Sequence, residues 1–275
     1  MLEYTFCHLP GIGPATEQRL WQRGILTWTD ALEKLDKPGK KNDTIRTGIL
    51  ESRKRLAQGD AKYFASALPA GQQYRLFNKF RQRAVFLDIE TTGLSPWDEI
   101  TTIALYDGTS VRYYVQGDNL DEFPADILTY GLIITYNGKT FDLPFIRARM
   151  DCPLDQAHID LRYVLGSLGF KGGLKRCETA MGINRGDLDG VDGSFAVVLW
   201  QEYCKTGNPG ALDTLLAYNI EDVINLETLM IRAYNLNIEA MGFRDILPAP
   251  PPVTNPFSPD MDLVNRLRSS VFAFR

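Results

Sequence analysis

Asp88 and Glu90 are the residues of this sequence that point most directly to chemistry, because they stand two positions apart in an apolar segment. The apolar neighbours that predict a buried strand here are Val85, Phe86, Leu87 and Ile89. Side chains in a strand alternate with a period of two, so both carboxylates should leave the same face. Each would then raise the pKa of the other and resist desolvation.

Two buried acids need a compensating positive charge. No Lys or Arg occurs between Arg83 and Arg112. Hard divalent cations such as Mg²⁺ and Mn²⁺ prefer carboxylate oxygens. We therefore predict a divalent metal site at this strand, with a strand end whose acids merely face solvent as the alternative.

A third acid should reach the same edge of the sheet. Residues 131–136 predict another strand, which ends in an Asn137-Gly138 turn before Asp142 begins a helix. This turn would bring Asp142 over the carboxyl end of the strand, where ligands collect in open α/β sheets. Capping of the helix is the ordinary alternative role for this residue.

A late helix supplies a further polar stripe. Asn208 and Pro209 predict the start of a long helix, on which Tyr218, Asp222 and Asn225 share one face. The remainder of this helix is largely apolar, so the stripe needs a polar partner. The acids of the central strand would be that partner.

Taken together, these stretches resemble, in chain order, the DEDD exonuclease superfamily, which groups ribonuclease D with the proofreading domains of DNA polymerases. The Tyr variant is indicated, because Ala217 stands where the other variant has His. From Phe77 to about Leu229 the chain is similar to a bacterial family of RNase H-like predicted exonucleases. The matching stretches are Asp88-x-Glu90 within Phe86–Leu94, Asn137-x4-Asp142 within Tyr136–Asp142, His158–Asp160, and Tyr218-x3-Asp222.

The resemblance implies an α/β fold with an RNase H-like mixed sheet flanked by helices, and two-metal hydrolysis of phosphodiesters. Two divalent cations, Mg²⁺ or Mn²⁺, would be held by Asp88, Glu90, Asp142 and Asp222. Tyr218 would orient the attacking water. Leu94 would wedge against a terminal base, and Asn137 and Lys139 would lie near the phosphate or hold their loop. The implied activity is removal of nucleotides from 3′ ends, with DNA favoured over RNA. We interpret His158 as a structural, hydrogen-bonded residue.

The segment Leu9–Ile25 resembles a helix-hairpin-helix, in which backbone N–H groups hold a DNA phosphate without reading sequence. Gly11, Ile12 and Gly13 would form the hairpin, Pro14 would begin the next helix, and Arg19 would add charge. Two positions depart from the family. Glu17 replaces a small packing residue and Ala15 replaces a frequent lysine. The alternative is a plain helical turn that supports the fold.

The organisation that we predict is a small all-helical module (1–70), a connecting segment (71–84), the RNase H-like domain (85–247), and a Pro-rich spacer with a C-terminal helix (248–275). Within the module, Thr29-Asp30 should cap a helix to Leu35, and Pro38-Gly39 should precede helices at 44–56 and 60–68. The aromatic and basic residues of 74–83 should anchor the connecting segment, with base stacking as the alternative. Residues 184–193 should form a loop near the site. The final helix, capped at Ser258–Asp260, should dock on the protein.

Charge divides the chain. Residues 1–84 carry 15 Lys and Arg against 8 Asp and Glu, a net +7, whereas residues 85–275 carry 15 against 26, a net −11. This asymmetry favours a basic module that meets a polyanion and an acidic domain offset by metal. The four scattered cysteines and the non-basic N-terminus favour a cytoplasmic protein with neither a disulfide framework nor a zinc site. A structure-selective endonuclease and a non-catalytic nucleic-acid-binding protein are the other functions compatible with these features.

Overall fold

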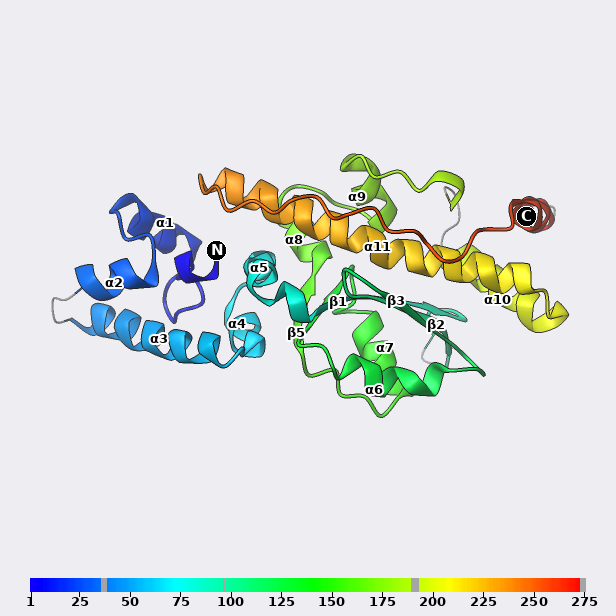
Figure 1. Ribbon diagram of the computed structural model, residues 1–275, viewed down its shortest axis with the longest axis horizontal. Helices are drawn as coiled ribbons and strands as arrows, with labels where there is room; N and C mark the ends of the chain where they lie inside the picture. Colours follow the sequence, from blue (N-terminus) through cyan, green and yellow to red (C-terminus); the bar gives the residue numbers. More distant parts are fainter. Residues whose placement is uncertain (36–38, 96, 189–192, 273–275) are drawn as a thin grey trace.

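A five-stranded mixed sheet covered by helices forms the body of the protein (Figure 1). The computed structural model describes residues 1–35, 39–95, 97–188 and 193–272. The central strand β1 (Ala84–Thr91) pairs antiparallel with β2 (Ile100–Tyr106) and parallel with β4 (Leu132–Thr135). The outer strands are β3 (Val111–Val115) and β5 (Ala157–Asp160), in the order β3-β2-β1-β4-β5. The predicted fold class is confirmed, and so are the strand that carries Asp88 and the strand predicted at 131–136.

The alternation of β1 divides the core into two layers. Val85, Leu87 and Ile89 pack on the side of the sheet covered by α6 (Phe123–Ile127) and α7 (Asp142–Arg149). Phe86 points to the other side, which is covered by the long helix α11 (Pro209–Ala240). Figure 1 shows these helices on opposite sides of the sheet. Asp88 and Glu90 share the face of Phe86, so both acids lie beneath α11.

The remaining elements of the body complete these layers. They are η4 (Leu120–Glu122), α8 (Leu161–Ser167), α9 (Leu174–Ala180), η5 (Gly186–Leu188), α10 (Gly193–Thr206) and α12 (Met261–Phe272). Asn208 caps α11 by accepting a 3.0 Å hydrogen bond from the N–H of Gly210, as predicted. Among the described residues, no helix combines the length and the apolar character that a membrane crossing requires.

The C-terminal helix docks on the body, as expected from the sequence. Leu263 and Val264 of α12 are buried. Asp260 caps this helix by accepting a 2.9 Å hydrogen bond from the N–H of Leu263, and its own N–H donates to Thr214 Oγ1 of α11 at 2.9 Å. Residues 248–252 form neither helix nor strand, and the chain runs along α11 in Figure 1.

The N-terminal module is helical, but two predicted helix starts were wrong. Its elements are η1 (Leu2–Tyr4), α1 (Pro14–Gln22), α2 (Trp28–Lys34), α3 (Lys40–Ala57) and α4 (Ala61–Ala67). Thr27 caps α2 in place of Thr29-Asp30, because Asp30 is the third helical residue of a reciprocal capping box with Thr27. Helix α3 begins at Lys40 rather than Thr44, immediately after Gly39. Pro38 lies outside the described residues.

The connecting segment is anchored in the core, as predicted. Its short helices are η2 (Ala70–Leu76), α5 (Phe77–Phe80) and η3 (Arg81–Arg83). Tyr74, Leu76, Phe77 and Phe80 are buried, and one apolar cluster runs without a break from the module to α11. These rings therefore serve packing within the protein rather than stacking on bases.

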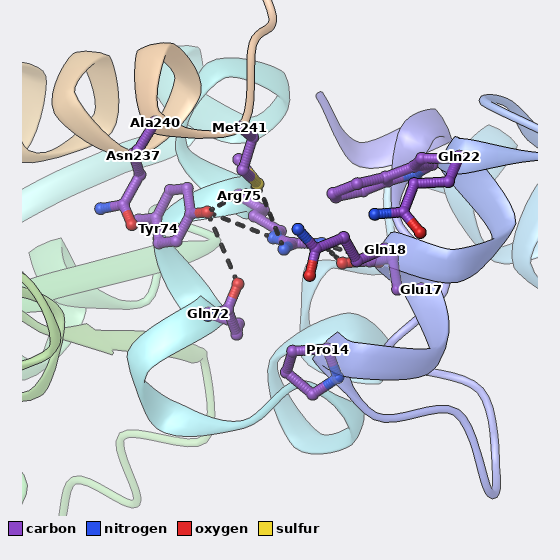
Figure 2. A pocket seen from close by; sticks show the side chains of 11 residues that line it. Pro14, Glu17, Gln18, Gln22, Gln72, Tyr74, Arg75, Asn237, Ala240 and Met241 are labelled. Atoms are coloured by element: carbon purple, nitrogen blue, oxygen red, sulfur yellow. Dashed lines mark hydrogen bonds and ion pairs between the residues drawn. The ribbon is translucent and has the colours of Figure 1, made fainter.

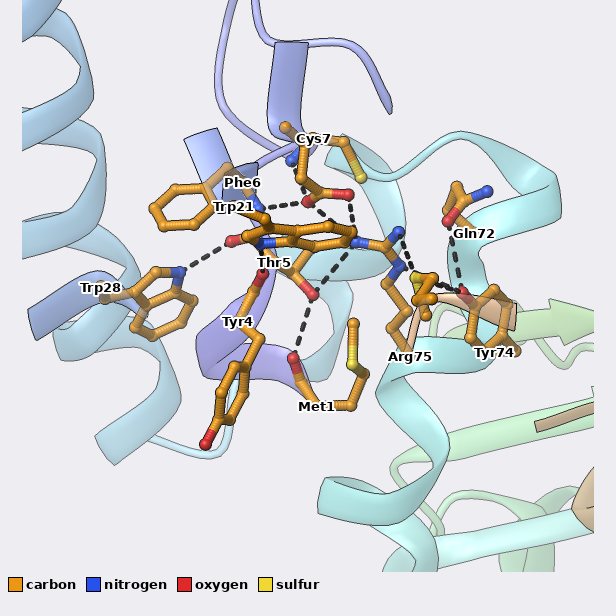
Figure 3. Close-up of polar contacts among 12 residues, drawn as sticks. Met1, Tyr4, Thr5, Phe6, Cys7, Trp21, Trp28, Gln72, Tyr74 and Arg75 are labelled. Atoms are coloured by element: carbon orange, nitrogen blue, oxygen red, sulfur yellow. Dashed lines mark hydrogen bonds and ion pairs between the residues drawn. The ribbon is translucent and has the colours of Figure 1, made fainter. Parts of the chain in front are cut away.

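Glu17, the departure from the hairpin family, joins the module to the body, and Figure 3 shows its partners Phe6, Cys7 and Arg75. Its carboxylate accepts hydrogen bonds from the N–H groups of Phe6 at 2.6 Å and Cys7 at 3.0 Å. Arg75 Nη1 donates to both of its oxygens at 2.8 Å. The side chains of Glu17 and Arg75 are only 1% and 2% exposed, so each charge depends on the other for solvation.

This ion pair forms the floor of a cleft between α1 and the end of α11 (Figure 2). The cleft measures about 500 Å³. Carboxamides and rings line it, namely Gln18, Gln22, Gln72, Asn237, Trp21 and Tyr74. The guanidinium of Arg75 lies 5.7 Å from the centre of the Trp21 ring. Module and body therefore meet through a continuous apolar cluster and, beside it, a polar cleft over the buried Glu17–Arg75 ion pair.

Glu17→Gln should lower the free energy of unfolding by about 3–5 kcal/mol, because it leaves the guanidinium of Arg75 buried without its counter-charge. Urea unfolding followed by far-UV circular dichroism measures this loss. Glu3→Gln is the matched control, since Glu3 is an exposed acid of the same module, and it should change stability by less than about 0.5 kcal/mol. Equal stability of the two variants would show that the buried pair does not hold the junction.

Candidate metal centre

Three carboxylates converge beneath α11. Asp88 and Glu90 of β1 and Asp222 of α11 each offer an oxygen, and these oxygens lie within 4.8 Å of one another. Glu90 and Asp222 are buried, whereas Asp88 is partly exposed. The residues that the sequence placed on a strand and on a helix far along the chain therefore form one acidic cluster.

Asp142, the fourth predicted acid, lines the same cavity at the start of α7. It is buried, but it is not part of the group of three oxygens. The cavity measures about 610 Å³. Tyr218, Leu94 and Asn137 also line it, together with Gly193 and Ser194 at the start of α10. The structure therefore brings the four acids and the phenol to one pocket, as predicted.

Asn219 is a residue of the site that the sequence analysis missed. Its Nδ2 donates to Asp88 Oδ2 at 2.8 Å, and its Oδ1 accepts from Thr102 Oγ1 of β2 at 3.0 Å. The predicted stripe directed Asn225 toward the acids of the central strand, but the amide of Asn225 donates to Glu221 of its own helix at 3.4 Å. The signal that the sequence offered was an Asn directly after Tyr218 in a largely apolar helix.

Burial is the main cause of the raised pKa values of the four acids. It raises the pKa of both Asp88 and Glu90 well above the ordinary values, and the charges of Asp222 and Asp142 raise both further. Burial likewise raises the pKa of Asp142 to about 7 and that of Asp222 to about 6. Each acid therefore holds its proton more tightly than it would in water.

A positive charge next to the cluster comes from Arg185, which is far from Asp88 and Glu90 in the sequence. Arg185, in the loop after α9, places Nη2 2.5 Å from Asp222 Oδ1. Glu178 of α9 holds the same guanidinium by two hydrogen bonds of 2.5 and 2.7 Å. The inference that metal alone would balance the acids was therefore incomplete, because Arg185 lowers the pKa of Asp222 against the effect of burial.

Tyr218 lies one turn before Asp222 and is buried at the same pocket. Burial, followed by the charge of Asp222, raises the pKa of its phenol above the ordinary value. The hydroxyl therefore stays protonated at neutral pH and can donate a hydrogen bond. Lys175 Nζ lies 4.8 Å from the ring centre, which places a second cation, contributed by α9, next to the acids.

The turn at residues 137–139 is fixed by Asp160, the buried last residue of β5. The carboxylate of Asp160 accepts hydrogen bonds from the N–H groups of Asn137 at 2.8 Å and Lys139 at 3.1 Å. Asn137 has a φ of +69°, a conformation that Asn tolerates better than most residues. A Cβ at position 138 would collide with Thr135, so this position requires glycine. His158 Nε2 lies 2.9 Å from Thr135 Oγ1, which fits the structural interpretation of His158.

The other predicted nucleic-acid contacts occupy two places. Leu94 lies at the mouth of the metal pocket and is 84% exposed. Gly11 has a φ of +74°, as a hairpin requires, whereas Ile12 is buried. Arg19 is exposed and donates to Thr16 Oγ1 at 3.0 Å.

The residues present fit a hard divalent cation. All four candidate ligands offer carboxylate oxygens. Oδ1 of Asp222 is buried, and among the described residues it has a close ion pair but no aligned hydrogen bond. An acidic cluster with raised pKa values and an incompletely satisfied oxygen is one that a divalent cation would stabilise.

Comparison with known proteins gives one match at the level of sequence families. The family model of the RNase H superfamily matches residues 85–234. No curated protein matches the sequence. All four candidate metal ligands lie within the matched residues.

Two solved structures are similar to parts of the chain. The family B DNA polymerase of the hyperthermophilic archaeon Pyrobaculum calidifontis is 16% identical over 57% of this chain and 24% of its own, with a TM-score of 0.42. The chain therefore spans about a quarter of that polymerase. Brucella melitensis NrnC with bound Mg²⁺ is 17% identical over 62% of this chain and 93% of its own, with a TM-score of 0.30.

In metal-free buffer Asp142 and Asp222 should make the free energy of unfolding fall as pH rises from about 4 to about 7, an effect opposed by His8 and His158, whose pKa burial lowers to about 4. The sign follows because folding raises the pKa of Asp142 to about 7 and of Asp222 to about 6, so through these two groups the folded state binds more protons in this window. Thermal melting in EDTA across this range measures the effect. In Asp142→Asn the fall should be smaller and the melting temperature at pH 7 level or higher. The same pH dependence of stability in the wild type and in Asp142→Asn would contradict this electrostatic account.

Proposed function

The chain belongs to the RNase H superfamily, and on that premise we propose that it is a metal-dependent nuclease that hydrolyses phosphodiester bonds of nucleic acid. One observation carries the proposal. Three carboxylate oxygens, from Asp88, Glu90 and Asp222, lie within 4.8 Å of one another in a pocket that also holds Asp142 and Tyr218.

The roles of the residues follow from this arrangement. Asp88, Glu90, Asp142 and Asp222 would hold two divalent cations, Mg²⁺ or Mn²⁺, in a largely buried cluster. When bound, the cations would supply an activated water and stabilise the leaving 3′-oxygen. The protonated phenol of Tyr218 would orient that water, and Asn219 would fix the carboxylate of Asp88 through its 2.8 Å hydrogen bond.

For polarity we propose 3′-to-5′ exonuclease action, with DNA favoured over RNA. The exposed side chain of Leu94 stands at the mouth of the pocket, where it could pack against the terminal base of a strand that ends there. Endonuclease action on the same site is the second candidate, since a metal site does not itself require a strand end. A purely binding function is disfavoured, because all four acids are present in the pocket.

The basic N-terminal module would hold duplex DNA through its phosphates. Gly11 and Ile12 border a separate cavity of about 360 Å³, together with Lys40 and Lys41 at the start of α3. Both lysines are exposed. The hairpin backbone and two cations therefore face one hollow, an arrangement that suits sequence-independent contact with a phosphate backbone.

A digestion series with Mg²⁺ or Mn²⁺ tests the nuclease. The substrates are single-stranded DNA and RNA of matched sequence, labelled at either end, and circular forms of each. We expect mononucleotide release from 3′ ends by the wild type and no detectable release by Asp88→Asn or Asp222→Asn. Asp262→Asn, an exposed acid of α12, should behave as wild type.

The same series contains an internal comparison. Tyr218→Phe keeps the packing of the ring, so it should retain metal binding by calorimetry and lose roughly 10²–10⁴-fold in rate. Full turnover by this variant would make the phenol a packing residue. Cleavage of circles would replace exonuclease by endonuclease action, and an active Asp88→Asn enzyme would refute the two-metal site.

For the module we expect Lys40→Ala/Lys41→Ala to weaken binding of duplex DNA regardless of sequence. The dependence of log K on log salt should become shallower by about 0.9 for each phosphate that the variant no longer neutralises. Lys54→Ala, an exposed lysine in the last turn of the same helix, is the matched control. Deletion of residues 1–70 is a poor test, because it would strip Arg75 of Glu17. Unchanged affinity and salt slope would rule out this surface as the duplex-binding one.

A further inference from the structure

A second cavity adjoins the metal pocket. It measures about 650 Å³ and is lined by Tyr136, Asn137, Arg162, Gly166, Phe170, Lys171, Gly172 and Gly173. Tyr136 and Asn137 also line the pocket of the acidic cluster, so they form a wall common to both. The two cavities therefore lie next to each other on either side of these residues.

The charge around this cavity is opposite to that of the surrounding domain. Residues 85–275 carry a net charge of −11, yet residues 162–176 contain four Lys and Arg and no Asp or Glu. Two of these cations, Arg162 and Lys171, line the cavity and are exposed. Cations gathered beside an acidic pocket favour a ligand with negative charge at a defined distance from the metal centre.

Asp160 positions Arg162 and the common wall together. One carboxylate of Asp160 accepts hydrogen bonds from the N–H groups of Asn137, Lys139 and Arg162, at 2.8, 3.1 and 3.0 Å. The guanidinium of Arg162 in turn donates to Asn137 Oδ1. A guanidinium has five N–H donors, so this hydrogen bond leaves Arg162 able to bind a phosphate. Within the described part of the chain, Lys171 Nζ has no polar partner.

The remainder of the cavity suits a sugar and a base. Gly172 has a φ of +121°, and the hydroxyl of Tyr136 donates to its carbonyl, so the glycine-rich backbone is held close to the wall. The rings of Phe170 and Tyr136 line the cavity. Aromatic rings provide stacking surfaces that accept any base.

We propose that this cavity is a second nucleotide subsite, which holds the nucleotide next to the one cleaved at the metal centre. Arg162 and Lys171 bind its phosphate, and Phe170 and Tyr136 contact its base. Asp160 is a positioning residue that acts through the backbone of Asn137, Lys139 and Arg162. The proposal rests on the proposed nuclease function, and it makes the substrate a strand of at least two nucleotides.

Two substrates that differ only in occupying the subsite test this proposal. The p-nitrophenyl ester of thymidine 5′-monophosphate has one nucleotide, which fills the metal pocket alone, whereas a single-stranded pentathymidylate extends beyond it. For Arg162→Ala and for Lys171→Ala we expect KM for the pentamer to rise about tenfold, with kcat and all constants for the ester within twofold of wild type. Arg162→Lys should recover part of the affinity.

The matched controls are Lys205→Ala and Arg244→Ala, which remove exposed cations outside both pockets and should leave both substrates unaffected. An unchanged KM for the pentamer would overturn the subsite. Equal losses on the pentamer and the ester would also overturn it, because the substitutions would then act on the metal pocket.

Binding without turnover separates this proposal from the nuclease itself. If the wild type cleaves neither substrate, the proposed function fails, and fluorescence anisotropy of labelled decathymidylate in metal-free buffer still tests the subsite. Lys171→Ala should then raise Kd about tenfold and make the salt dependence shallower by about 0.7, the value for one phosphate on a single strand. An unchanged Kd and slope would overturn the subsite independently of catalysis.

Discussion

The repulsion among carboxylates buried on one face of β1 is the constraint on which the rest of the site depends. Strand alternation places Asp88 and Glu90 under α11, and the crossing of that helix brings Asp222 to within 4.8 Å of both. Such an arrangement stores unfavourable energy until a cation or protons relieve it. Burial raises the pKa values of all four acids, and the charges of Asp222 and Asp142 raise those of Asp88 and Glu90 further. Affinity for a divalent cation is the useful counterpart of the same energy.

The surrounding contacts limit this cost without removing it. Arg185 approaches Asp222 while two hydrogen bonds from its guanidinium to Glu178 balance its own charge. The Arg185–Glu178 pair can therefore stay in place whether Asp222 faces the guanidinium or a bound cation. On the other side, Asn219 ties Asp88 to α11 and to β2. Asn219 is neutral, and the charge of Arg185 is balanced by Glu178. These partners therefore orient Asp88 and Asp222 without fully neutralising the acids that would bind a cation.

The sequence by itself determined the elements and the acids. Period-two alternation in β1 and the long apolar periodicity of α11 are local signals, so they predicted the strands, the helix and the shared face of Asp88 and Glu90 correctly. The stretches around Asp142 and Asp222 were also identified from local spacing. The starts of α2 and α3 were misplaced because two possible helix starts lie within a few residues of each other. Local propensity alone did not show which of the two the chain uses.

Only the tertiary structure decided which distant groups complete the site. Arg185 reaches Asp222 because the fold brings the loop after α9 against α11, and no periodicity records that path. Asn219 replaced Asn225 because the rotation of α11 against β1 and β2 selects which side chain points inward. Glu17 became a structural link for the same reason, since its partner Arg75 lies 58 residues away in the chain. Sequence spacing fixes which residues share an element, whereas charge compensation depends on distances in space that packing alone sets.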